Sequence, residues 1–181
     1  MKGNFKKSVF LVRLKEGGND DDKDDPGGRT SRGIIQREWD AYRLLHAEKI
    51  LPEDVWDAAD EDINWIYFQS YWLPWCDQDF FRKGVDYSFF DMRVHHGGYW
   101  AKRILQRALG VKDDGSIGII TKTALLNSDS TALLKEIHDR RERYMRKLYW
   151  FRKYGKGWLE RNDFVERRAL KMVDDNLSLV A

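Results

Sequence analysis

Apolar residues recur at helical spacing along most of this chain. Near the N-terminus the stripe comprises Phe5, Val9 and Val12, with Phe10 and Leu14 widening it. Steps of three and four residues place such side chains on one face of a helix, so the pattern predicts a first amphipathic helix over about residues 4–16. Gly17 and Gly18 are expected to end that helix.

The same spacing continues through the rest of the sequence. It predicts helices over residues 36–49, 60–73, 86–96 and 100–109, a short helix from Thr121, and longer ones over 129–153 and 157–175. Gly97-Gly98 and Gly155-Lys156-Gly157 are expected to separate neighbouring helices. Only residues 17–35, rich in Gly, Asp and Asn, favour an irregular loop or a short hairpin. The predicted fold class is therefore mainly α with one small hairpin.

The composition is that of a folded domain. The chain has 181 residues, of which 14% are aromatic and only three are Pro. That aromatic content excludes a disordered chain. Cys76 is the sole cysteine, which excludes an intramolecular disulfide and a cysteine-based metal centre.

No apolar stretch in the sequence is long enough for a membrane span or a secretory signal. We therefore expect no stable membrane insertion and no signal peptide. A cytoplasmic protein that depends on another component to cross a membrane fits this expectation.

Charge is unevenly distributed along the sequence. The formal net charge is only +2, which argues against a protein that coats nucleic acid. Residues 139–172, however, hold twelve Lys or Arg against five Asp or Glu. Such a segment could contact an anionic bacterial envelope, or its apolar stripe of Tyr144, Leu148 and Phe151 could pack on the core.

Three polar residues flank the irregular segment and suggest glycoside chemistry. Glu16 ends the first predicted helix, Asp25 follows nine residues later and Thr30 five beyond that. Glycoside hydrolysis needs a carboxylic acid to protonate the leaving oxygen and a second carboxylate to activate water or attack the sugar. The same residues also fit a solvated helix end and a turn before Pro26, so spacing alone leaves both interpretations open.

The alternating acids of this segment do not form a known metal site. Counted from Asp20, an EF-hand loop needs Gly at its sixth position and Glu at its twelfth, where this chain has Asp25 and Ser31. The adjacent pair His95 and His96 lacks the four-residue spacing of a helical zinc pair. No metal and no other cofactor is predicted.

Clustered motifs resemble glycoside hydrolase family 108, the lysozyme-like N-acetylmuramidases. They are Glu16-Gly17-Gly18, Asp25-Pro26-Gly27-Gly28, Thr30, Gly33-Ile34, Tyr71-Trp72-Leu73-Pro74, Gly84-Val85-Asp86-Tyr87, Phe90-Asp91, Gly97, Leu105-Gln106, Leu109-Gly110, Asp114-Gly115, Ile117-Gly118, Thr121, Arg141, Tyr144, Gly157-Trp158 and Arg161. These motifs cover nearly the whole chain in the family's order. The resemblance implies an α-rich lysozyme-like fold and hydrolysis of the β-1,4 bond between N-acetylmuramic acid and N-acetylglucosamine.

The resemblance also implies roles for individual residues. Glu16 matches the family's catalytic Glu and would be the general acid, while Asp25 and Thr30 would position the attacking water. If water lies between the sugar and Asp25, the two carboxyl groups should be ~6.5–9.5 Å apart and the anomeric configuration should invert.

The second half of the chain resembles the family's predicted peptidoglycan-binding segment around residues 105–125. We therefore expect a catalytic part over residues 1–95 and a helical wall-binding part over residues 96–181, packed together as one globule. The 105–125 segment could equally be a simple connection between helices. The pattern of residues 105–125 predicts a helix, a Gly/Asp loop and the N-terminus of a second helix, where free backbone N–H groups can bind a ligand.

Aromatic and imidazole side chains are the expected substrate contacts. Tyr71, Trp72 and Tyr99 could stack on pyranose rings, although aromatic residues on helices more often belong to the core. His95 and His96 stand where the family favours Asn-Ser, and Ile35 stands where it has Thr. His95 is a candidate for the cleft wall, with a packing role as the alternative.

The sequence favours a peptidoglycan hydrolase of the phage endolysin type. Such an enzyme would lyse bacterial cell walls after release through a pore-forming partner or delivery in a virion, and would be a monomer. A bacterial muramidase is also compatible with the sequence, as is a chitinase-like specificity. The alternative class is a noncatalytic wall-binding or virion structural protein that keeps the fold.

Overall fold

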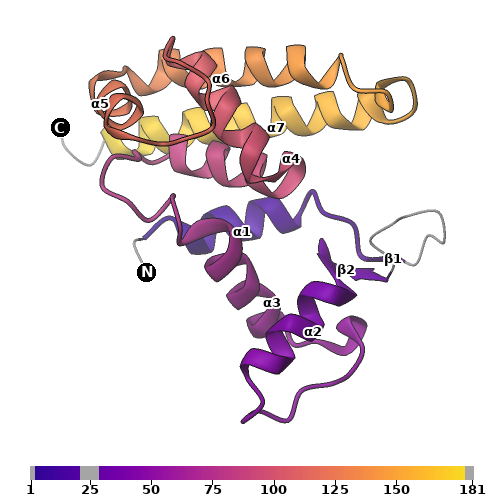
Figure 1. The fold of residues 1–181 in the computed structure, drawn as a ribbon. Helices are drawn as coiled ribbons and strands as arrows, with labels where there is room; N and C mark the ends of the chain where they lie inside the picture. The colour runs from indigo at the N-terminus through magenta and orange to yellow at the C-terminus, as the bar shows by residue number, and fades with distance from the viewer. Residues whose placement is uncertain (1–2, 21–28, 178–181) are drawn as a thin grey trace. The chain divides into compact units, whose positions relative to one another are not determined.

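The computed structural model describes residues 3–20 and 29–177. The chain is mainly helical with a small antiparallel sheet, which confirms the predicted fold class (Figure 1). Contacts between Cα atoms divide it into two units, Phe5–Trp72 and Met1–Asn4 with Leu73–Ala181. The expected division at residues 95 and 96 stays a prediction.

The unit Phe5–Trp72 combines short helices with the sheet. Its elements are α1 (Phe5–Arg13), β1 (Asn19–Asp20), β2 (Thr30–Ser31), β3 (Ile34–Ile35), α2 (Gln36–Leu45), the 3-10 turn η1 (Val55–Asp57), α3 (Asp60–Ile66) and the π-helical turn η2 (Tyr67–Trp72). β2 pairs antiparallel with both β1 and β3. The predicted hairpin is thus a three-stranded sheet of very short strands.

The apolar face of α1 packs against η2. Phe5 contacts the rings of Phe68 and Trp72 edge to face, with centroids 5.0 and 5.5 Å apart. Phe10 and Leu14, expected to widen the stripe, are instead 61% and 58% exposed. The buried stripe is therefore narrower than predicted, because only one side of this short helix faces the core.

The second unit is built from four helices, α4 (Val85–Ala108), α5 (Ile119–Asn127), α6 (Ser130–Met145) and α7 (Phe151–Leu177). Gly97, at φ 75° and ψ 158°, interrupts α4 where the sequence predicted a break. The break predicted at Gly155–Gly157 is wrong, since α7 runs through it and the connection lies at residues 146–150. A Cβ at Gly155 would lie 2.8 Å from the Phe151 ring, so this glycine gives that ring space within the helix.

A buried ionic cluster joins α4, α6 and α7. Asp91 accepts from Arg141 and Arg161, each through an Nη2 atom 2.7 Å from a carboxylate oxygen. Asp91 and Arg141 are fully buried, and the two guanidinium groups hold the pKa of Asp91 below its usual range against the opposing effect of burial. Losing one partner would leave an uncompensated buried charge.

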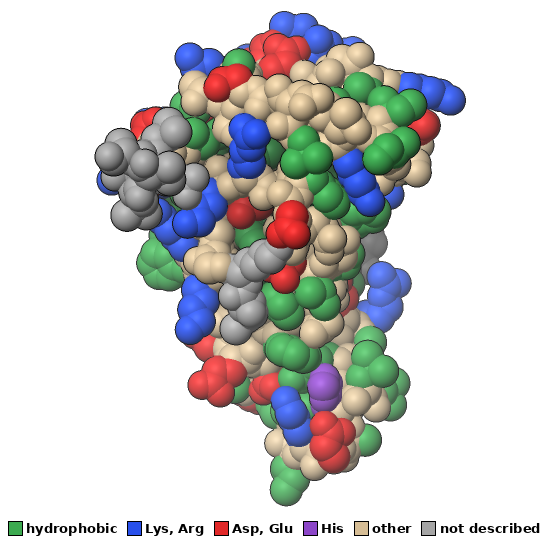
Figure 2. Space-filling model, turned by 90° about the vertical axis from the view of Figure 1, so that its left-hand side faces the viewer, with side chains coloured by type: hydrophobic (Ala, Val, Ile, Leu, Met, Phe, Trp, Pro, Cys, Tyr) green, Lys and Arg blue, Asp and Glu red, His purple; other side chains and the backbone are tan. Residues whose placement is uncertain are grey.

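The surface mixes charge types. The face drawn in Figure 2 interleaves acidic, basic and hydrophobic side chains, so no single sign of charge dominates it. Among the described residues, no helix is both long enough and apolar enough to cross a bilayer.

Candidate active site

Glu16 lies in the turn that closes α1. Its backbone N–H donates to the carbonyl of Val12 at 3.0 Å, and the N–H of Lys15 donates to the same carbonyl at 2.8 Å. The last turn of the helix therefore fixes the backbone from which the Glu16 side chain projects. That side chain is half-buried, and its Oε1 atom is shielded from solvent.

The β2–β3 turn forms a wall against Glu16. Arg32 and Gly33 connect the strands with positive φ values of 49° and 82°, as a two-residue type I′ turn requires. A Cβ on Gly33 would lie 2.9 Å from Cγ of Glu16 and 2.4 Å from Oη of Tyr67. Only glycine lets the turn approach both side chains this closely.

Tyr67 fixes the position of this turn through a hydrogen bond to its backbone. The residue is fully buried in η2, and its hydroxyl donates to the carbonyl of Arg32 at 2.8 Å. Glu16, Gly33 and Tyr67 thus come together from α1, the sheet and η2. This cluster fixes the side of the carboxylate that faces the protein.

An ionic contact ties the same turn to two helices. Asp60, at the start of α3, accepts from Arg13 at 2.7 Å and from Arg32 at 2.5 Å. These hydrogen bonds hold the pKa of the Asp60 carboxyl below its ordinary value. Asp60 is 63% exposed, so the contact orients the turn more than it stabilises the fold.

Thr30 lies in β2, opposite Asp20 of β1 and Ile35 of β3. Its carbonyl accepts from Nε1 of Trp56 at 3.0 Å, so η1 supports the strand. Asp25 lies outside the described residues. The spacing between the two carboxylates, and with it the inverting mechanism, stays a prediction.

Tyr71 and Trp72, both in η2, differ in exposure. The hydroxyl of Tyr71 donates to Oε1 of Glu38 in α2 at 2.7 Å, and the residue is half-buried. Trp72 is 1% exposed and packs on Phe5, so it belongs to the core of its unit. Their contacts with substrate stay predictions.

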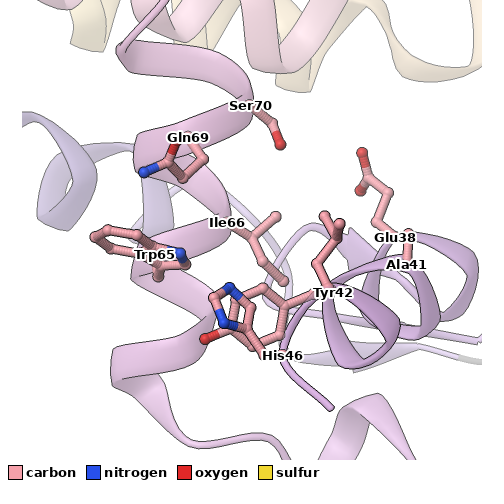
Figure 3. A pocket seen from close by; sticks show the side chains of 9 residues that line it. Glu38, Ala41, Tyr42, His46, Trp65, Ile66, Gln69 and Ser70 are labelled. Atoms are coloured by element: carbon pink, nitrogen blue, oxygen red, sulfur yellow. The ribbon is translucent and has the colours of Figure 1, made fainter. Parts of the chain in front are cut away.

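A pocket of about 430 Å³ lies between α2 and the α3–η2 segment (Figure 3). One wall carries Glu38, Ala41, Tyr42, Leu45 and His46, and the other carries Trp65, Ile66, Gln69 and Ser70. Glu38, the partner of Tyr71, links this pocket to η2. Glu16 does not line it, so the pocket is separate from the predicted acid.

The other two predicted contacts, His95 and Tyr99, lie in the second unit. His95 and His96 accept from Arg141 at 3.0 and 2.9 Å, respectively. Burial and the neighbouring Arg141 together lower the pKa of His95 to about 3. His95 is therefore neutral near pH 7 and is part of the ionic cluster, as the packing alternative expected, while its substrate role stays untested.

Comparisons with known proteins place the chain in a family. The family model described as glycosyl hydrolase 108 matches residues 10–97, and the model described as a predicted peptidoglycan domain matches residues 100–163. A solved structure of SagA from Brucella abortus superposes with a TM-score of 0.79 and 31% identity, over 95% of this chain and 97% of that one. No curated protein matched. The chain belongs to the glycosyl hydrolase 108 family.

Family membership makes this chain a glycoside hydrolase with a lysozyme-like fold, and the matched peptidoglycan domain supports peptidoglycan as its substrate. The Glu16 cluster lies within the part that matches the glycosyl hydrolase model. Among the described residues, no group of three or more His, Cys, Asp or Glu is arranged to hold a metal ion.

The peptidoglycan domain of this family 108 hydrolase contains an ordered loop at residues 110–118. Gln106, 1% exposed, donates to Asp114 and accepts from the N–H of Gly115 at 2.8 Å. Tyr99 lies beside this loop, 55% exposed, and its hydroxyl accepts from Arg103 at 2.8 Å. An exposed ring and a guanidinium group therefore flank the loop.

Several residues that support the site in this hydrolase were not predicted as such from the sequence. They are Arg13, Trp56, Asp60 and Tyr67. The sequence predicted only that Tyr67 lies in a helix over residues 60–73, and no local signal indicated that its hydroxyl would meet a turn 35 residues earlier. Contacts this distant in sequence carry no periodic pattern.

Proposed function

We propose that this family 108 hydrolase is an N-acetylmuramidase that cleaves the β-1,4 bond between N-acetylmuramic acid and N-acetylglucosamine. The observation that carries the proposal is the position of Glu16, fixed by the last turn of α1 and packed against Gly33 within the matched hydrolase domain. A carboxyl group held in one orientation can deliver its proton to one oxygen of a bound substrate.

In this proposal Glu16 protonates the glycosidic oxygen as the bond to the anomeric carbon breaks. Water adds to that carbon, and Asp25 takes up the proton that the water loses. Thr30 orients the water from β2, whose position depends on the hydrogen bond between Trp56 and the Thr30 carbonyl. The sum of these steps is addition of one water across the bond, with Glu16 and Asp25 restored by proton exchange with solvent.

The second unit would hold the glycan strand. Tyr99 offers an exposed ring, and Arg103, which pairs with Asp113 at 3.1 Å, donates to the Tyr99 hydroxyl and holds that ring beside the loop. Both residues flank the loop of the matched peptidoglycan domain. Tyr71 is the corresponding aromatic candidate in the first unit.

We further propose a role in bacterial lysis. A phage enzyme of this kind would act after release through a pore-forming partner or as part of a virion. A monomer suffices for this role, because one chain contains both matched domains.

Identifying the new reducing ends tests the specificity. Purified peptidoglycan is digested, reduced with borohydride and hydrolysed, and the amino sugar alcohols are identified by mass spectrometry. The proposal predicts muramitol above the level of a Glu16→Gln digest. Glucosaminitol alone would assign the cut to the other glycosidic bond, and release of glucosaminitol from chitin oligomers at a comparable rate would indicate chitinase-like specificity.

A further inference from the structure

The connection between α6 and α7 has an unusual composition. Residues 147–156, here called the basic tip, include Lys147, Arg152, Lys153 and Lys156 and contain no Asp or Glu. The tip comprises the end of the connection and the first turns of α7, at the opposite end of this helix pair from α5 (Figure 1). Four positive charges thus lie within ten residues.

The basic tip also exposes three aromatic side chains. Tyr149 is 86% exposed, Trp150 is 55% exposed and Tyr154 is 44% exposed. Phe151 is half-buried instead, and its ring lies against Gly155 one turn later in the same helix. None of the three exposed rings belongs to the buried core, and grouped exposed aromatics mark an interaction surface.

The arginines of α6 leading to the tip are electrically balanced. Arg140, Arg143 and Arg146 pair with acids one turn earlier, at 2.5 to 2.7 Å. The tip itself contains no Asp or Glu. Its sequence therefore adds four positive charges and no negative charge to residues 139–172.

The arrangement of the rings distinguishes a membrane surface from a sugar. Tyr149 and Trp150 lie edge to face at 82°, and Nζ of Lys153 lies 5.9 Å from the Trp150 ring centre and 4.9 Å from that of Tyr154. Tyr149 and Trp150 therefore share no flat face on which a pyranose could stack, and Lys153 places a positive charge beside Trp150 and Tyr154. Trp and Tyr with neighbouring Lys and Arg are instead the residues of a lipid headgroup layer.

We propose that the basic tip binds the surface of a bilayer that contains anionic phospholipids. The cations attract the headgroups, and Tyr149, Trp150 and Tyr154 enter the interface without spanning the membrane. This site is distinct from the Glu16 cluster, which lies in the other unit. It would hold the hydrolase at the membrane face next to its peptidoglycan substrate.

Sedimentation with sucrose-loaded vesicles tests the proposal. The full-length protein is mixed with vesicles of phosphatidylcholine alone or with 30% phosphatidylglycerol, at low and physiological salt. Two variants probe the tip, Lys147→Gln/Lys153→Gln for charge and Tyr149→Ser/Trp150→Ser for the rings. Ile119→Ser/Ile120→Ser is the matched control, because both residues are strongly exposed apolar side chains in the same unit.

The wild-type protein and the Ile119/Ile120 control should bind the anionic vesicles, and salt should weaken that binding. Each tip variant should reduce the partition coefficient about tenfold or more, because one removes two positive charges near the anionic surface and the other removes two rings from the interface. Circular dichroism and hydrolysis of soluble peptidoglycan fragments should be unchanged in both tip variants, which shows that they fold.

Three results would overturn the proposal. The first is equal binding to both vesicle types, and the second is vesicle binding that survives both tip substitutions. The third is absence of vesicle binding while the aromatic variant loses affinity for insoluble peptidoglycan, which would make the tip a glycan-binding surface.

Discussion

At Gly33, the main chain of a tight turn touches the side chain of the predicted acid. The position combines φ of 82° with a Cβ site 2.4 Å from Tyr67 Oη and 2.9 Å from Glu16 Cγ. Any side chain there must strain the turn and displace one of these neighbours. The orientation of Glu16 thus depends on a residue that carries no chemistry.

Gly33→Ala should therefore lower activity by more than the accompanying loss of folding stability can account for. We expect kcat to fall by about tenfold or more, because small misplacements of a reacting group are costly, together with a loss of ~1–2 kcal/mol in unfolding free energy. Steady-state rates and thermal melts check this. Gly118→Ala is the control, since nothing lies within 4 Å of a Cβ there and its φ is negative; equal effects of the two substitutions would refute the argument.

The residues of the site were predictable only to the extent that motifs name them. The candidates Glu16, Asp25 and Thr30 come from the family resemblance, because their spacing alone fits a solvated helix end and a turn as well, and their catalytic roles stay predictions. The contact of Tyr67 with Arg32 does not follow, because it depends on how η2 packs under the sheet. The role of His95 was still harder to predict from the sequence, because its partner Arg141 is 46 residues away.

Among the elements, η1 supports the sheet although it is only three residues long. Trp56 donates through Nε1 to the carbonyl of Thr30, and its ring lies 4.4 Å from the guanidinium carbon of Arg29. Strands of two residues have little pairing of their own, so β2 relies on this support.

Trp56→Phe tests that support by removing one hydrogen bond while keeping an aromatic ring. We expect a loss of about 1 kcal/mol, seen as a melting temperature lower by about 2–4 °C, and a several-fold lower kcat because Thr30 loses its fixed position. Trp150→Phe, at an exposed site in the other unit, should leave both unchanged. A kcat for Trp56→Phe at the wild-type level would show that β2 does not need η1.

Helix boundaries show where sequence patterns succeed and fail. The break at Gly97 was predicted and is real, because the residue takes an extended conformation with positive φ that favours glycine. The break at Gly155 was wrong, because that glycine is selected by the Phe151 ring packed over it and keeps helical pairing. The sequence signal, a glycine within a helical pattern, is the same at both positions, and only the packing around each glycine shows which one interrupts a helix.

For the molecule as a whole, buried histidines couple stability to pH. Burial and the nearby Arg141 together lower the pKa of His138 to about 4. His138 is 1% exposed and lies between Ser88 and Asn162 at 2.9 Å from each. Between pH 6.5 and 4 the unfolded chain therefore binds a proton that the folded chain does not, so stability falls with falling pH.

Thermal melts should show this loss on going from pH 7 to pH 5. His138 contributes up to ~1.4 kcal/mol per pH unit in that range, and His95 acts in the same direction. Asp86 opposes them, because burial raises its pKa to about 6. His138→Gln should flatten the dependence, and an unchanged slope in His138→Gln would contradict the assignment.

The most direct test of the whole account is the rate at which Glu16→Gln hydrolyses purified peptidoglycan, compared with wild type and Glu61→Gln. Glu61 is an exposed acid of α3 in the same unit and serves as the matched control. The account predicts a kcat lower by ~10²–10⁴ for Glu16→Gln, with unchanged binding to peptidoglycan and unchanged melting temperature, and a wild-type rate for Glu61→Gln. A Glu16→Gln enzyme that retains the wild-type rate would contradict the assignment of Glu16 as the general acid.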